Sequence, residues 1–284
     1  MRWTPGRVSS DIEDRRGGRF GGFGRLGIGG FLILLILSAV FHRDFFSLLG
    51  AGNDQAALSP SAESGPVATT PAEDTLVLFM SFVLDDAQQT WDSLLTQRGV
   101  PYTHARMMLF RDAVQSGCGV AQSAMGPFYC PTDGRIYLDL GFFNELKQRF
   151  GAPGDFAEAY VVAHELGHHI QELVGTEQQV RQAQQQNPAD ANALSVRLEL
   201  QADCYAGVWG HSTKQRDLLD PGDVNEGLAA AAAVGDDRIQ QSAGEGVHPE
   251  SFTHGTAAER AHWLQRGLRS GNPADCDTFS GPID

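Results

Sequence analysis

A run of apolar residues near the N-terminus differs from the rest of the chain. Residues 26–42 carry no Asp, Glu, Lys or Arg and are flanked by Arg25 and Arg43. These 17 residues lie at the short end of what a transmembrane helix needs, and the flanking arginines can reach the polar boundaries on either side. The pattern predicts one uncleaved transmembrane helix over residues 26–42. A cleaved signal peptide is the alternative.

Beyond residue 75, apolar positions recur mostly at helical spacing. The predicted helices span residues 76–96, 142–149, 155–174, 190–211, 223–234 and 256–269. Residues 135–140 alternate as a strand does and follow turn residues, so residues 127–140 are predicted to form a β-hairpin. Residues 43–74 are rich in Ala, Ser, Pro and acidic residues, which predicts a flexible linker. The chain is therefore predicted to be α+β, mainly helical, with a small hairpin or sheet in one domain over residues 75–284.

Charge sets the predicted orientation. Arginines are frequent in residues 1–25, and no Lys or Arg occurs between Arg43 and Arg98. This asymmetry predicts a basic cytoplasmic segment over residues 1–25 and a domain outside the cytoplasm. We therefore expect a single-pass protein of the inner membrane, with the domain in the periplasm. The formal net charge of −14 argues against a nucleic-acid partner.

The pentapeptide His164-Glu165-Leu166-Gly167-His168 carries the strongest chemical signal. Residues four apart share one face of a helix, so His164 and His168 can bind one metal ion from the same side. Glu165 can reach a water molecule on that metal and act as its general base. This HExxH pattern is typical of zinc hydrolases. The alternative is a solvated helix that happens to carry two histidines.

The surroundings of the motif favour a packed helix. Asp155 is predicted to cap it, with Glu158 three residues later. Gly167 in a helix interior costs about 1 kcal/mol relative to alanine, which predicts close approach by another backbone. His169 points about 100° away from His168 and is therefore a poor co-ligand.

A zinc site of this kind needs a third protein ligand. Glu199 is the predicted ligand, and Asp203 shares its helix face four residues later. Asp203 is predicted to accept the free N–H of a ligand histidine and fix its tautomer. Two solvated acids on a surface helix are the alternative, and the apolar neighbours Leu198 and Leu200 argue against it.

The chain resembles a known family in HELGHH followed by RLELQADCYAGVWG. These segments, with SGCGVAQSAMGPFYCPTDGRIYLDLGFF and SFTHGTAAERAHWLQRG, look like the bacterial family of neutral zinc metallopeptidases. The resemblance covers most of residues 75–284 and the N-terminal anchor. It implies a zincin-like fold with Zn²⁺ as the cofactor. It says little about substrates.

The ELQAD segment is also similar to that of integral-membrane zinc proteases, which carry a His…Arg pair of similar spacing to His254 and Arg260. That resemblance implies that His254 donates to the oxyanion and that Arg260 orients either the His254 segment or a carboxylate on a ligand helix. Gly255 stands where that family has proline, which puts the match in doubt. A structural histidine is the alternative, with Tyr205 and His248 as substitute donors.

The four cysteines all lie beyond the apolar run, and no CxxC pair occurs. Three pairings are possible. Cys118–Cys130 is favoured as the local choice, and Cys204–Cys276 would then tie the Glu199 helix to the C-terminal tail. Buried free thiols are the alternative.

The sequence thus predicts a membrane-anchored zinc endopeptidase acting on protein or peptide substrates. Zn²⁺ is held by His164, His168 and Glu199, and Glu165 is the general base. By analogy with zincins, the strand at residues 135–140 is expected to align an extended peptide. The alternatives are a catalytically silent zinc-binding scaffold of the cell envelope and a zinc hydrolase of cell-wall amide bonds.

Overall fold

The computed structural model describes residues 1–17, 69–244 and 246–283. Met1–Arg16 and Ala68–Asp284 form one compact unit. The predicted transmembrane segment, residues 26–42, and nearly all of the predicted linker lie outside the described residues. Among the helices that are described, none has the length and apolar character needed to cross a membrane.

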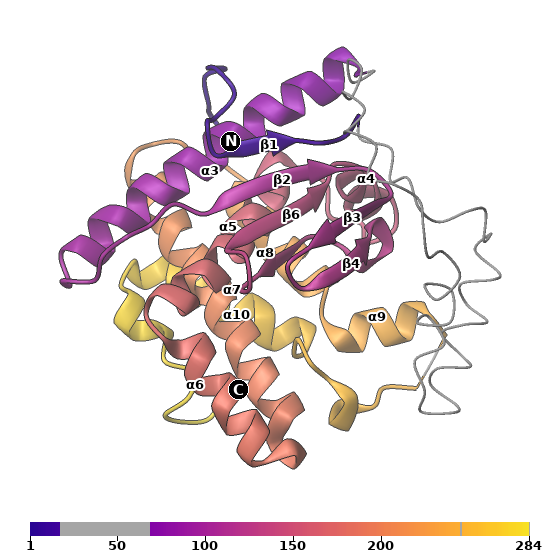
Figure 1. Cartoon of the computed structure of the whole chain (residues 1–284), viewed down its shortest axis with the longest axis vertical. Helices are drawn as coiled ribbons and strands as arrows, with labels where there is room; N and C mark the ends of the chain where they lie inside the picture. The colour runs from indigo at the N-terminus through magenta and orange to yellow at the C-terminus, as the bar shows by residue number, and fades with distance from the viewer. Residues whose placement is uncertain (18–68, 245, 284) are drawn as a thin grey trace, which may run out of the picture. The chain divides into compact units, whose positions relative to one another are not determined.

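Helices make up most of the described part (Figure 1). They are α3 (Pro71–Thr96), α4 (Gly141–Gln148), α5 (Asp155–Leu173), α6 (Thr176–Gln186), α7 (Ala191–Gln215), α8 (Asp223–Ala233), α9 (Asp236–Ser242) and α10 (Ala257–Ser270). The predicted helices correspond to α3, α4, α5, α7, α8 and α10. Helices α6 and α9 were not among the predicted helices.

A four-stranded sheet has the order β1-β2-β6-β5. Its strands are β1 (Ile12–Asp14), β2 (Arg106–Phe110), β6 (Arg135–Asp139) and β5 (Phe128–Cys130). The predicted hairpin is confirmed as the antiparallel pair of β5 and β6, whereas β1, β2 and β6 run parallel. A second hairpin joins β3 (Ala113–Ser116) and β4 (Gly119–Gln122). Because β6 is paired on both sides, β5 is the edge strand at this end of the sheet.

The N-terminal residues belong to the folded domain. β1 pairs with β2, so that Ile12 lies opposite Met107, as the adjacent ribbons of Figure 1 show. Trp3 packs against Phe79 and Phe82 of α3, with ring centroids 5.2 and 6.2 Å apart.

This packing places Met1–Arg16 in the folded unit, whereas residues 1–25 were predicted to form a segment separate from the domain. A single membrane crossing at residues 26–42 would put two strands of one sheet on opposite sides of the membrane. The predicted single-pass arrangement and the observed pairing therefore exclude each other.

Two predicted boundaries also change. Helix α3 begins at Pro71, five residues before the predicted start, because Thr70 and Glu73 form a capping box. The domain therefore begins within the stretch assigned to the linker. Asp155 is the first residue of α5 and does not cap it, since Gly154 occupies the N-cap position.

Close helix contacts hold the centre of the domain. A Cβ on Gly167 of α5 would lie 3.0 Å from the carbonyl oxygen of Ala202 on α7, so the predicted backbone approach is confirmed. Gly207 of α7 and Gly267 of α10 meet as closely, because a Cβ on Gly267 would lie 2.0 Å from the carbonyl oxygen of Cys204. Helix α7 is thus fixed against α5 on one side and α10 on the other.

Both favoured disulfides are present. Cys118 is bonded to Cys130, and Cys204 is bonded to Cys276. The first joins the turn after β3 to the end of β5. The second ties α7, one residue after Asp203, to the C-terminal segment.

Candidate metal centre

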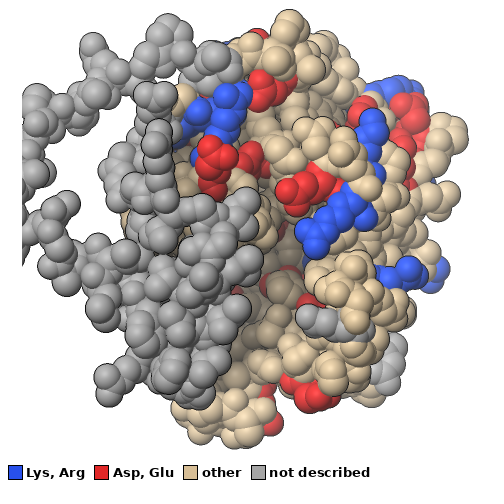
Figure 2. Space-filling view, turned by 90° about the vertical axis from the view of Figure 1, so that its right-hand side faces the viewer, with Lys and Arg blue, Asp and Glu red and all other residues tan. Residues whose placement is uncertain are grey.

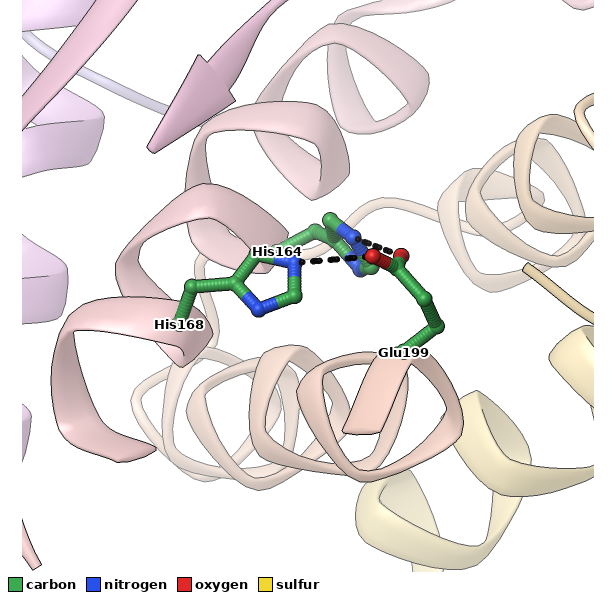
Figure 3. A group of neighbouring side chains, drawn as sticks. All are labelled: His164, His168 and Glu199. Atoms are coloured by element: carbon green, nitrogen blue, oxygen red, sulfur yellow. Dashed lines mark hydrogen bonds and ion pairs between the residues drawn. The ribbon is translucent and has the colours of Figure 1, made fainter. Parts of the chain in front are cut away.

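The structure brings His164, His168 and Glu199 together as one group of possible metal ligands. Figure 3 shows the two imidazoles projecting from α5 towards the carboxylate of Glu199, which projects from α7. The Nε2 atom of His164 lies 3.1 Å from one carboxylate oxygen, and the Nε2 atom of His168 lies 3.5 Å from the other.

These spacings fit a tetrahedral zinc ion. Zinc bonds to imidazole nitrogen and carboxylate oxygen are about 2.0–2.2 Å long, so two ligand atoms of a tetrahedral site lie about 3.3–3.5 Å apart. The observed distances between Nε2 and oxygen atoms bracket this value. Two nitrogens and one carboxylate are also a donor set that catalytic zinc sites use.

The Nδ1 atom of each ligand histidine forms a hydrogen bond that orients the ring. His164 Nδ1 lies 2.8 Å from an oxygen of Asp203, and His168 Nδ1 lies 2.8 Å from Oε1 of Gln171. Gln171 is itself fixed, because its amide donates to the carbonyl oxygen of Leu198 at 2.7 Å. Both acceptors keep the proton on Nδ1 and leave Nε2 free for a metal.

Asp203 lies at the centre of a buried network, as the sequence suggested. The guanidinium of Arg260 donates to both oxygens of Asp203, at 2.9 and 3.0 Å. The hydroxyl of Tyr160 donates to the same carboxylate at 2.6 Å and accepts from Arg260 at 3.1 Å. Burial alone would raise the pKa of Asp203, but Arg260 and His164 together outweigh burial and the pKa is lowered. Asp203 is therefore an anion, and Arg260 orients this carboxylate on the ligand helix.

The metal-free centre has the electrostatics of a cation site. Burial alone would lower the pKa of His164, but Asp203 and Glu199 together raise it to about 10. Burial would likewise raise the pKa of Glu199, yet the two histidines hold it well below its usual range. Glu199 is therefore an anion facing the two Nε2 atoms. Without a metal, a proton on Nε2 of His164 pairs with this carboxylate, and a divalent cation would take the place of that proton.

Glu165 lines the cavity beside these ligands without belonging to the ligand group. Its side chain is buried, and burial raises the pKa of its carboxyl. A carboxylate with a raised pKa both accepts and returns a proton more readily near neutral pH.

His254 lines the same cavity. The carboxylate of Asp236 accepts hydrogen bonds from the backbone N–H groups of Thr253, His254 and Gly255, at 2.8, 2.7 and 3.1 Å. The other oxygen of Asp236 lies 3.2 Å from His254 Nδ1. This hydrogen bond raises the pKa of His254 despite partial burial. Thr256 begins the following helix with the predicted capping box to Glu259.

The remaining histidine and tyrosine candidates lie elsewhere. Tyr205 is buried against Trp91, and His248 is exposed and pairs with Glu250 at 3.4 Å. His169 faces away from the ligands, as expected, and its Nε2 atom lies 2.7 Å from the carbonyl oxygen of Thr103. None of these three residues lines the cavity.

The cavity has a volume of about 550 Å³ and is lined by parts of α4, α5, α7 and β5. Figure 2 shows one face of the domain hollowed near its centre, with carboxylates visible in the hollow. Phe128 and Tyr129 of β5 line the cavity, whereas residues 135–140 do not. The expectation that residues 135–140 align a peptide is therefore wrong, because both edges of β6 are already paired.

Three residues of the site were not predicted from the sequence: Tyr160, Gln171 and Asp236. Tyr160 and Gln171 had a usable signal, since they lie four residues before His164 and three after His168 on the same helix face. Asp236 had none, because it meets His254 only through the tertiary fold.

The geometry predicts different effects on metal binding for Glu199 and Asp203. Glu199→Ala removes a ligand and should abolish stoichiometric zinc binding. Asp203→Ala removes only the hydrogen bond behind His164 and should weaken zinc affinity by about 10–100-fold. Competition titration against a chelator measures both, with His248→Ala as a control that keeps full affinity. Unchanged affinity in Glu199→Ala would remove it from the ligand set.

Comparisons with known proteins agree with this centre. The family model described as "Putative neutral zinc metallopeptidase" matches residues 1–279. The "Uncharacterized protein YpfJ" of Escherichia coli (strain K12) is 46% identical over 290 aligned residues, which cover 100% of both chains. The "Uncharacterized protein Rv2575" of Mycobacterium tuberculosis (strain ATCC 25618 / H37Rv) is 49% identical over 190 residues, covering 63% of this chain and 64% of its own. No solved structure matches. The chain belongs to the neutral zinc metallopeptidase family, and Zn²⁺ is its cofactor.

Proposed function

We propose that the protein is a zinc-dependent endopeptidase. The observation that carries this proposal is the position of Glu165, a buried carboxylate beside the three ligands that is not itself a ligand. A structural zinc site has no use for such a group, whereas peptide hydrolysis requires a base for the attacking water. This favours a hydrolase over a silent scaffold.

Zn²⁺ held by His164, His168 and Glu199 supplies Lewis acidity, which polarises a carbonyl group and lowers the pKa of a water molecule. Glu165 takes the proton of the attacking water and passes it to the leaving amine. Burial supports this role, because it raises the pKa of the carboxyl and so favours holding the proton between the two steps. Asp203 and Gln171 keep the ligand histidines in the required tautomer.

His254 is the proposed donor to the oxyanion that forms during hydrolysis. Its Nδ1–H donates to Asp236, and the hydrogen bond raises the pKa of the ring. The protonated ring has a second N–H, at Nε2, that can donate to negative charge in the cavity. Because the backbone of residues 253–255 is anchored to Asp236, this donor is held in place before substrate binds.

The substrate is proposed to align on β5. This strand is the edge of the sheet on the cavity side, and two of its three residues line the cavity. An extended peptide can pair with the main chain of an edge strand, so the fold supports binding of a polypeptide rather than a compact small molecule.

We also propose that the domain functions outside the cytoplasm. Its two disulfides support an oxidising compartment. Since Met1–Arg16 forms part of the same unit, this segment must lie in that compartment too. Attachment to a membrane through residues 26–42 remains part of the proposal, in an arrangement that leaves both flanking parts on one side.

The role of Glu165 predicts a separation of activity from metal binding. Glu165→Gln should retain one zinc ion per chain and lose activity on an unfolded protein by about 10² or more, the scale typical of a general base. Metal analysis and a protease assay on the same sample test this. Loss of zinc would show that Glu165 is misassigned, and full activity would remove the proposed mechanism.

The Asp236–His254 pair predicts a pH effect. The hydrogen bond to Asp236 raises the pKa of His254, so the protonated donor persists to higher pH than in a free imidazole and is lost as pH rises through the raised pKa. Asp236→Asn should lower the pKa, so the alkaline limb of the kcat/KM profile should move to lower pH. His248→Ala, an exposed histidine outside the cavity, should leave the profile unchanged. An unmoved alkaline limb in Asp236→Asn would exclude His254 as the protonated donor.

The compartment proposal is tested with two matched exposed positions. Val8 is 47% exposed in the N-terminal segment and Val120 is 46% exposed in the β3–β4 hairpin. In intact cells, a membrane-impermeant maleimide should label both Val8→Cys and Val120→Cys. Labelling of Val120→Cys alone would support the single-pass arrangement against the observed strand pairing. Labelling of neither until lysis would place the domain in the cytoplasm.

A further inference from the structure

One wall of the cavity beside the metal centre is built from half-buried aromatic rings. Phe128 and Tyr129 come from β5, Phe142 comes from α4, and Phe150 follows that helix. Met125 extends the same surface and is 68% exposed, more than any other large hydrophobic residue in the described part of the chain. We call these five residues the aromatic wall.

The wall is rigid because its rings are supported from behind. Phe128 stacks on buried Tyr137, with ring centroids 4.8 Å apart and planes 7° apart. Phe142 packs edge-on against buried Phe143 at 6.0 Å. Gly126 passes over the Phe142 ring with a φ of 77°, and a Cβ there would lie 3.6 Å from it. A surface held this firmly loses little conformational entropy when a ligand covers it.

The tyrosine of the wall is fixed differently. The hydroxyl of Tyr129 lies 3.1 Å from His169 Nδ1, and His169 is buried one residue after the metal ligand His168. The polar end of Tyr129 is thus occupied by the protein. The HExxH helix therefore positions β5 as well as the metal.

Charge near this wall does not favour a charged substrate side chain. Helix α4 contributes Glu145, and Arg149 follows it one turn later with the opposite sign. Glu177 also lines the cavity, but Arg181 pairs with it at 3.3 Å. These charges are offset within the protein. The guanidinium of Arg149 also lies over the Phe150 ring, 5.3 Å from its centroid, so the other wall residues present the apolar surface to the cavity.

We infer that the aromatic wall is the subsite for a bulky apolar side chain next to the scissile bond. This inference rests on the proposed peptidase function and names its substrate class: peptide segments that carry aromatic or branched aliphatic residues. Amides flanked by small or charged groups, as in cell-wall crosslinks, would leave the wall in contact with water and gain nothing from it.

The test uses the full-length zinc-loaded protein and quenched fluorescent peptides that differ at one position, which is Phe, Leu, Ser, Asp or Lys. That position is moved along the peptide across the cleavage site. At one position, Phe and Leu should exceed Ser, Asp and Lys by about 10-fold or more in kcat/KM, since a hydrophobic pocket discriminates on this scale. The same order should appear in peptide binding to Glu165→Gln, measured by fluorescence anisotropy.

Two substitutions connect the preference to the wall. Met125→Ser changes an exposed side chain and leaves the fold intact, and Phe142→Ser removes a wall ring. Both should reduce the preference for Phe and Leu several-fold, through KM more than kcat. Val120→Ser is the matched control, because Val120 is exposed but does not line the cavity. The preference of Val120→Ser for Phe and Leu should equal that of the unmodified protein.

The outcomes separate this inference from the proposed function. Cleavage that depends on Glu165 but shows no preference, or prefers Lys or Asp, would overturn the aromatic subsite and leave the peptidase standing. Apolar-selective binding to Glu165→Gln without cleavage by the zinc-loaded protein would overturn the peptidase and leave the wall as a binding site. Preference retained in both Met125→Ser and Phe142→Ser would also overturn the assignment of the wall.

Discussion

The buried ion pair between Asp203 and Arg260 is the interaction on which the metal centre depends. The pair joins α7 to α10 in the buried interior. The Asp203 carboxylate also forms hydrogen bonds with His164 and Tyr160 of α5. Both side chains of the pair are buried, so each charge needs the other. Removing one partner of such a pair costs about 3–5 kcal/mol. The Asp203 carboxylate therefore serves both the stability of the helix packing and the orientation of the metal ligand His164.

The close helix contacts make this network possible. Gly207 and Gly267 let α7 and α10 approach until their backbones touch, and Gly167 does the same between α5 and α7. Larger residues at these contacts would separate the helices and lengthen hydrogen bonds that are now between 2.6 and 3.1 Å. The precision of the zinc site thus begins with residues that carry no chemistry of their own.

The sequence predicted the part of the site that is local in the chain. Glu165 and its flanking histidines share one turn of helix, and Glu199 and Asp203 share another, so helical periodicity placed them. Asp236 supports His254 across 18 positions and a change of direction, which no periodicity encodes. The position of β5 at the edge of the sheet was not predicted, because β2 was not recognised as a strand that pairs with β6. β2 is nearly continuously apolar because it lies inside the sheet, and such a run does not distinguish a strand from a buried helix.

The pairing of β1 with β2 has a consequence for the order of folding. Ile12 lies opposite Met107, which follows it by 95 positions, so this pairing spans a longer stretch of chain than the pairing of β6 with β2 or with β5. Long-range parallel pairing forms late, because the loop must close before any contact compensates for the lost chain entropy. Until then Trp3 and the edge of β2 are uncovered, and an uncovered strand edge invites association with other chains. The β1 edge of the sheet is therefore protected against such association only once this distant pairing has formed.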